Sequence, residues 1–103
     1  MNSGIPTISQ RKLERHKLLC DRLHDLYCRK NADYGDAFHK VFLEEGVASC
    51  RIRLSDKLYR FRKLTQDAET QKVKEESITD TLIDLANYAL LSILELEFAD
   101  EET

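Results

Sequence analysis

The stretch EESITDTLIDLANY, residues 75–88, decides the fold that this sequence predicts. Its apolar residues recur three and four positions apart, which is the spacing of a buried helix face. Carboxylates stacked on a helix suit a divalent metal ion that carries phosphates. The stretch therefore predicts a helix with a candidate metal site on one polar row, which consists of Glu76, Asp80, Asp84 and Asn87.

Length and composition extend the helical prediction to the whole chain. A chain of 103 residues fits a single domain with one core. With 3 glycines, 1 proline and 34% charged residues, the composition favours helices, because strands would need more turn residues and more β-branched residues. We expect an all-α fold in three segments: a flexible leader at 1–8, one helical domain at 9–99 and an acidic tail at 100–103.

Residues that start or stop helices divide the domain further. Ser9 is a candidate N-cap for the first helix, and Asp36 for the second. Gly35 can take the positive φ that a break between them requires. Ser77 and Asp80 occupy the positions of an acidic capping box at the start of the last helix. The predicted helices cover about 9–31, 37–45, 47–65 and 77–99.

The last predicted helix is apolar on both sides. Leu91 and Leu94 fall on the side of the acidic row, opposite the predicted core stripe. A helix of this kind is usually covered on both sides. In so small a domain we expect another subunit to supply the second cover, which predicts a homo-oligomer. The core stripe consists of Ile78, Leu82, Leu85, Ala89, Ile93 and Leu96.

A basic row marks the helix predicted at 47–65. Arg53 and Arg60 can present forked donors to phosphate oxygens, and Lys57 adds a point charge. Both charged rows also have a simpler interpretation, as surface salt bridges of little energetic value and as acids solvated near a helix start. Asp56 is the one acid among six basic residues: Arg51, Arg53, Lys57, Arg60, Arg62 and Lys63.

A third cluster repeats every four residues along the first predicted helix and consists of His16, Cys20, His24 and Cys28. Neighbouring members could ligate Zn²⁺ in pairs, but four ligands spread over three turns cannot all meet one tetrahedral ion. We expect core packing or a half-exposed edge here. The three cysteines form no CxxC pair, which fits reduced thiols.

Several classes of protein do not fit the sequence. The chain shows no signal peptide and no run of 18 apolar residues, so we expect a cytoplasmic protein without a membrane partner. It has no glycine-rich phosphate loop and no nucleophile elbow. With a net charge of -3, the chain lacks the overall basic balance of a nucleic-acid-binding protein, so nucleic acid is not an expected partner.

Three segments together resemble a known family. KNADYG at 30–35, RLSDKLYR at 53–60 and ESITDTLIDLANY at 76–88 are similar to the nucleotide modification associated domain of bacteria and their phages. The resemblance implies a relation to the MazG-like and dimeric dUTPase pyrophosphohydrolases. The resemblance covers roughly 25–95. It implies a four-helix MazG-like bundle, assembled as a dimer or tetramer, in the cytoplasm of a bacterium or of a phage-infected host.

The resemblance also implies a reaction, in which acids from two helices hold Mg²⁺ or Mn²⁺ and water attacks a nucleoside triphosphate to give monophosphate and pyrophosphate. The expected metal ligands are Glu76, Asp80 and Asp84. Asp56 and Glu76 are the expected catalytic acids. The expected nucleotide-binding residues are Lys30, Asp33, Tyr34, Arg53, Lys57, Arg60 and Asn87.

One departure from the family pattern keeps two other functions open. Asp56 stands where two or three glutamates are expected on the third helix. The departure favours a non-catalytic binder, for instance a phage protein that sequesters a signalling nucleotide. A structural helical module is the third possibility, favoured if lysines or arginines pair with the acids of the last helix across the core.

Overall fold

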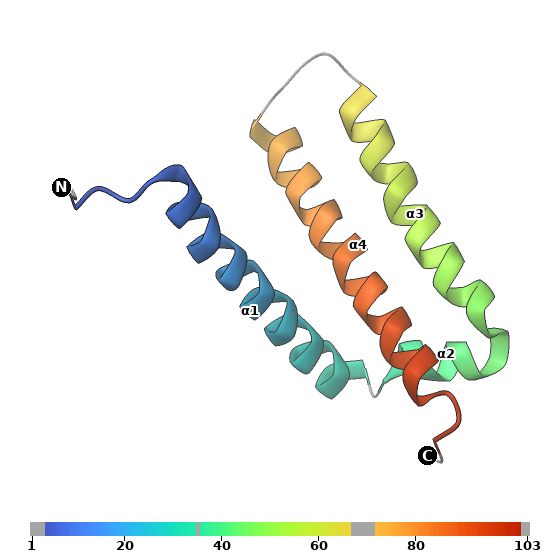
Figure 1. Ribbon diagram of the computed structural model, residues 1–103. Helices are drawn as coiled ribbons and strands as arrows, with labels where there is room; N and C mark the ends of the chain where they lie inside the picture. The colour runs from blue at the N-terminus through green and yellow to red at the C-terminus, as the bar shows by residue number, and fades with distance from the viewer. Residues whose placement is uncertain (1–3, 35, 67–71, 102–103) are drawn as a thin grey trace.

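The computed structural model describes residues 4–34, 36–66 and 72–101, without the side chains of 32–34 and 72–75. α4 lies between α1 and α3, and α3 and α4 run antiparallel (Figure 1). The short α2 packs against α3 and α4. Every regular element in the described residues is a helix, which confirms the all-α prediction: α1 (Ile8–Tyr34), α2 (Ala37–Glu45), α3 (Val47–Gln66) and α4 (Lys72–Phe98).

α1 begins one residue earlier than predicted, and its N-cap is Thr7. The Gln10 backbone N–H donates to Thr7 Oγ1 at 3.1 Å, and the Thr7 backbone N–H donates to Gln10 Oε1 at 2.8 Å. This reciprocal pair is a capping box, which satisfies two backbone donors at once. The prediction of Ser9 as the N-cap was therefore wrong, because Ser9 already lies inside the helix.

α4 begins at Lys72, five residues before the predicted capping box. Ser77 lies within the helix, where its carbonyl accepts a hydrogen bond from Thr81 Oγ1 at 2.7 Å. The capping box at Ser77 and Asp80 was therefore wrong. Lysine and glutamate at 72–76 are good helix formers and extend the helix toward the N-terminus. The sequence also predicted a polar linker at 66–74. Its ends belong to α3 and α4, and residues 67–71 lie outside the described residues.

Two positive φ angles mark the ends of α2, whose bounds match the prediction. Asp36 is the N-cap residue of α2, as predicted, but it has a φ of 59° and its side chain makes no capping hydrogen bond. Aspartate tolerates this left-handed conformation better than most residues. Gly46 follows the helix with a φ of 68°, and its N–H donates to the Phe42 carbonyl at 2.7 Å. Gly35, predicted to take the positive φ, lies outside the described residues.

α3 and α4 form the most closely packed pair, yet they enclose little apolar core. Among the described residues, Cys50 and Ile83 are the buried apolar side chains. On α3, Leu54 and Phe61 are half-buried, whereas Val47 and Leu58 are exposed. The protomer therefore leaves much of its apolar surface uncovered.

The orientation of α4 is the main correction to the sequence prediction. Most of the predicted core stripe faces outward. In the polar row, Asn87 is buried and Asp84 half-buried, whereas Glu76 and Asp80 are exposed. We call the exposed residues the outer row: Leu82, Ala89, Leu90, Ile93 and Leu96. We call the buried and half-buried residues opposite them the inner row: Asp84, Asn87, Tyr88, Leu91 and Glu95.

The sequence could not settle this orientation, because both sides of α4 carry apolar residues and the helical period fits either one. Leu91 and Leu94 illustrate the error. They were expected to contact another subunit, but both are half-buried within the protomer. Ile78 and Leu85, at the edge of the predicted stripe, are also half-buried.

Candidate functional site

A pocket of about 310 Å³ opens where the end of α1 meets α2, α3 and α4. This volume falls in the range of small-molecule sites. α1, α2 and α4 each supply three of the lining residues, α3 supplies two, and Asp36 lies just before α2. The lining residues are Tyr27, Lys30, Asn31, Asp36, Ala37, Phe38, Val41, Ser49, Arg53, Asn87, Tyr88 and Leu91.

Three aromatic side chains give this pocket an apolar part. Tyr27 comes from α1, Phe38 from α2 and Tyr88 from α4. The Phe38 and Tyr88 rings lie with their centroids 5.9 Å apart and their planes inclined by 38°. Aromatic rings offer flat surfaces on which a planar heterocycle can stack.

Polar residues from three helices face the same space. Lys30 and Arg53 are cations, and Asn87 brings an amide that is 6% exposed. These three were predicted as nucleotide-binding residues from segments far apart in the sequence, and the structure brings them together. A buried amide beside two cations can form directed hydrogen bonds while the cations neutralise an anion.

An ion pair lies one helical turn from the pocket along both α3 and α4. Lys57 Nζ is 3.1 Å from Asp84 Oδ2, with the two side chains 28% and 37% exposed. Lys57 follows Arg53 by four residues, and Asp84 precedes Asn87 by three. The predicted phosphate-binding lysine and metal-binding aspartate therefore contact each other beside the pocket rather than line it.

The other predicted metal ligands are more exposed. Arg22 Nη2 of α1 lies 3.4 Å from Asp80 Oδ1, and Glu76 is exposed. Within the residues that the structure describes, no three histidine, cysteine, aspartate or glutamate side chains are grouped to hold a metal ion. The three predicted metal ligands, Glu76, Asp80 and Asp84, thus lie on neighbouring turns of α4, and Asp80 and Asp84 are paired with an arginine and a lysine.

The remaining predicted residues fall outside the pocket. Asp56 and Arg60 are exposed on α3 and do not line it. The side chains of Asp33 and Tyr34 lie outside the described residues. The structure accordingly gives the predicted catalytic acids, Asp56 and Glu76, no shared site among the residues described.

A buried pair fixes α2 against α4 next to the pocket. His39 Nδ1 lies 2.7 Å from Glu95 Oε2, with the two side chains 18% and 12% exposed. This hydrogen bond raises the pKa of His39, although burial acts in the opposite direction. His39 Nε2 is buried without a hydrogen-bond partner. Because Phe38 and Val41 flank His39, the pair holds the α2 wall of the pocket in place.

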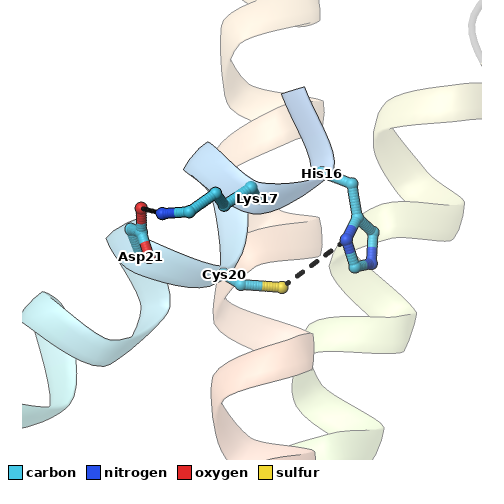
Figure 2. A network of polar contacts seen from close by, with 4 residues as sticks. All are labelled: His16, Lys17, Cys20 and Asp21. Atoms are coloured by element: carbon cyan, nitrogen blue, oxygen red, sulfur yellow. Dashed lines mark hydrogen bonds and ion pairs between the residues drawn. The ribbon is translucent and has the colours of Figure 1, made fainter. Parts of the chain in front are cut away.

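The His and Cys residues of α1 lie away from this pocket. Cys20 Sγ is 3.9 Å from His16 Nδ1 on an exposed face, beside the Lys17–Asp21 ion pair of 2.8 Å (Figure 2). A second contact of 3.6 Å joins Cys28 Sγ and His24 Nε2. The cysteines are free, and Cys50 is buried. These pairs do not occupy the core position that was one of the two expectations.

Much of the pocket lining escaped sequence analysis. Phe38 and Val41 of α2 and Tyr27 of α1 were not singled out from the sequence, because an apolar or aromatic residue within a helix is usually a packing residue. Nothing in the sequence around Ser49 marks it as a pocket residue. One hint was present, because Tyr27 precedes Lys30 by one turn and places an aromatic ring beside a predicted phosphate ligand.

Comparison with known proteins gives one match. The model of a protein family described as nucleotide modification associated domain 1 matches residues 30–96. The match spans the pocket lining from Lys30 to Leu91 and all of α2 and α3. No curated protein and no solved structure matches the chain. In the part of the chain that the structure describes, none of the helices is both long enough and apolar enough to cross a membrane.

Proposed function

Because the chain belongs to the nucleotide modification associated domain 1 family, we propose that its pocket binds a nucleotide. The observation that carries the proposal is the meeting of Lys30, Arg53 and Asn87 in one cavity with aromatic walls. The base stacks among Tyr27, Phe38 and Tyr88, where a planar heterocycle replaces water on apolar rings. A volume of about 310 Å³ suits a nucleoside, with the phosphates reaching beyond it.

The phosphates extend from the pocket between α3 and α4. Arg53 presents a forked donor to phosphate oxygens, and Lys30 adds a point charge from α1. Lys57, one turn further along α3, meets the distal phosphates once it leaves Asp84. The exchange is inexpensive, because a partly exposed ion pair contributes about 1 kcal/mol or less.

Nucleotide titration calorimetry tests the proposal. The probes are ATP, GTP, CTP and UTP and their monophosphates, each with and without Mg²⁺. Arg53→Gln should weaken binding about tenfold or more, the scale of a lost charge-assisted hydrogen bond. Arg51→Gln is the matched control, since it removes the same charge from an exposed position outside the pocket. Equal losses in both variants would show only nonspecific charge attraction, and unchanged binding in Arg53→Gln would refute the site.

Mg²⁺-dependent hydrolysis to monophosphate and pyrophosphate is the second candidate function. Asp84 favours it, because this acid is 37% exposed one turn from Asn87 and shares a face with Asp80 and Glu76. Mg²⁺ commonly takes one or two carboxylates and completes its coordination with phosphate oxygens and water. Asp84 and Asp80 can hold such an ion by exchanging their lysine and arginine partners, and the ion would then polarise the phosphate.

An assay of pyrophosphate release from the same triphosphates separates the two functions. A parent protein that binds nucleotide but releases no pyrophosphate is a binder, of the kind that sequesters a signalling nucleotide. Release that requires Mg²⁺ or Mn²⁺ and is lost in Asp84→Asn identifies a pyrophosphohydrolase. A MazG-like assembly and a bacterial or phage origin belong to the same proposal.

A further inference from the structure

We infer that each of the two histidine–cysteine pairs of α1 binds a Zn²⁺ ion, and that the His24–Cys28 pair binds it more tightly than the His16–Cys20 pair. The inference does not depend on nucleotide binding. It also uses other residues and another class of metal ion than the acids of α4. Three observations support it: the exposure of the two pairs, the distance between sulfur and nitrogen in each pair, and the spacing of the pairs along the helix.

The two pairs are exposed to solvent. His16, Cys20, His24 and Cys28 are all exposed, whereas Cys50 is buried. Free cysteine is among the residue types that are most often buried, so two exposed thiols that each contact an imidazole are unusual on one helix. Packing within the protomer therefore does not account for the two pairs, and a metal ion can reach both from solvent.

The ligand atoms of the His24–Cys28 pair are separated by the distance that a tetrahedral zinc ion requires. A Zn–S bond of about 2.3 Å and a Zn–N bond of about 2.0 Å, joined at the tetrahedral angle, place sulfur and nitrogen about 3.5 Å apart. Cys28 Sγ lies 3.6 Å from His24 Nε2. One ion can therefore bond to both atoms with little movement of either side chain.

The His16–Cys20 pair has the same spacing in the sequence but a wider separation in space. Cys20 Sγ lies 3.9 Å from His16 Nδ1, about 0.4 Å beyond the tetrahedral value (Figure 2). Binding there requires a side-chain rotation that brings the two atoms closer together. The neighbouring Asp21 is already paired with Lys17 at 2.8 Å and adds little attraction for a cation. We therefore expect weaker binding at this pair.

The two pairs bind separate ions. They are offset by eight residues, which is a rise of about 12 Å along the helix. Within the residues that the structure describes, no third histidine, cysteine or acidic side chain completes a metal-binding group, so water would fill the remaining positions. Two protein ligands are half the number in a structural zinc site. The dissociation constant should accordingly lie in the micromolar range, about 1–100 µM.

Binding exchanges the thiol proton for the metal ion. Sulfur bonds to the ion as a thiolate, the S–H proton passes to solvent, and the imidazole nitrogen donates its lone pair to the ion. Asp25 precedes Cys28 by three residues, a spacing that places its negative charge on the adjoining helix surface. The bound ion joins two successive turns of α1 and should raise the melting temperature, because it binds the folded helix.

Titration of the full chain with Co²⁺, under reducing conditions, tests the inference. Co²⁺ takes the same ligands as Zn²⁺ and reports sulfur coordination through a charge-transfer band in the near ultraviolet. The band should appear on titration and disappear when Zn²⁺ is added. Excess Mg²⁺ should leave it unchanged, because Mg²⁺ prefers oxygen ligands. No band at Co²⁺ concentrations up to about 1 mM, ten times the weakest expected dissociation constant, would overturn the inference.

Variants assign the tighter site. In a Cys20→Ser background, which removes the weaker pair, the band should persist. Adding His24→Asn should weaken Co²⁺ binding about tenfold or more, since metal sites lose this much even when an outer partner is removed. Adding His16→Asn is the matched control and should change nothing. Adding Cys28→His should preserve Zn²⁺ binding in calorimetry but abolish the band, because an imidazole replaces the thiolate.

Three results with these variants would overturn the inference. Equal losses in the His24→Asn and His16→Asn variants would show nonspecific binding. Unchanged affinity in the His24→Asn variant would show a thiol that acts alone. A band that survives in Cys20→Ser, Cys28→Ser would place the ion at Cys50. Circular dichroism confirms that each variant is folded, which substitutions at exposed positions should permit.

Discussion

The two sides of α4 have the opposite polarity from those of an ordinary surface helix, which buries its apolar side and exposes its polar side. The inner row presents Asp84, Asn87 and Glu95 to α2 and α3, whereas the outer row presents leucine and isoleucine to solvent. Buried polar groups lower stability unless they are bonded, so a polar interior usually serves a ligand or a specific partner. The contrast supports the proposal that the pocket beside the inner row binds a ligand, and it leaves the outer row as an exposed apolar face.

The largest effect expected from this contrast concerns two isoleucines on opposite sides of α4. Ile83 is 9% exposed and Ile93 is 49% exposed in the protomer. Ile83→Ala should lower the free energy of unfolding by about 2–4 kcal/mol, the range for a buried aliphatic truncation. Denaturation in urea, followed by circular dichroism, measures the loss.

Ile93→Ala sharpens the same comparison. For a side chain that stays exposed, the loss should be within about 0.5 kcal/mol. A loss close to that of Ile83→Ala means that a second copy buries the outer row, and a negligible loss in a protein shown to be oligomeric would assign the interface elsewhere.

A smaller effect is expected when the inner row is made apolar. Asn87→Leu removes a buried amide and keeps a similar volume, so the melting temperature should stay equal or rise. Nucleotide affinity should fall about tenfold, because the ligand loses a directed hydrogen-bonding group. Calorimetric titration and thermal denaturation of one preparation give both values. A lower melting temperature with unchanged affinity would make Asn87 a structural residue.

The smallest effect is a pH dependence at the His39–Glu95 pair. The folded pKa of His39 lies above its ordinary value of 6.5, so the pair contributes stability that is fully present below that value. The contribution is lost as the pH rises through the raised pKa. We expect the parent to lose about 1 kcal/mol through this pair as the pH rises from below 6.5 through the raised pKa.

His39→Gln isolates the contribution of this pair. Urea denaturation at several pH values should give a difference between parent and variant that shrinks as the pH rises. A difference that stays constant would mean that the pair acts through packing rather than charge, and nucleotide binding should then show no added pH dependence from the α2 wall.

Local sequence signals were sufficient to predict the number and the order of the helices in the described residues. Few glycines and prolines, good helix formers and regular apolar spacing predicted four helices, with the bounds of α2 correct and those of α3 correct to one residue. The start of α1 was misplaced by one residue, its end by three and the start of α4 by five, because a helix end depends on which of several neighbouring caps forms. Thr7 with Gln10 satisfies two donors, whereas Ser9 would satisfy one.

The candidate site was predicted in composition but not in arrangement. Lys30, Arg53 and Asn87 were singled out on separate segments, and only the packing of α1, α3 and α4 places them around one cavity. The acidic row was read as a metal site because residues four apart share a face. The sequence could not show that Lys57 and Arg22, on other helices, lie within reach of Asp84 and Asp80.

By itself the sequence determined the secondary structure and the residues that share each side of a helix, because both depend on short-range dihedral preferences and on a period of 3.6 residues. The tertiary structure decided which side of α4 faces its own chain. Both sides carry apolar residues, so burying either one removes similar apolar area from water. The choice depends on contacts between helices that are far apart in the sequence. His39 of α2 contacts Glu95 of α4, 56 residues later, and Lys57 of α3 contacts Asp84 of α4.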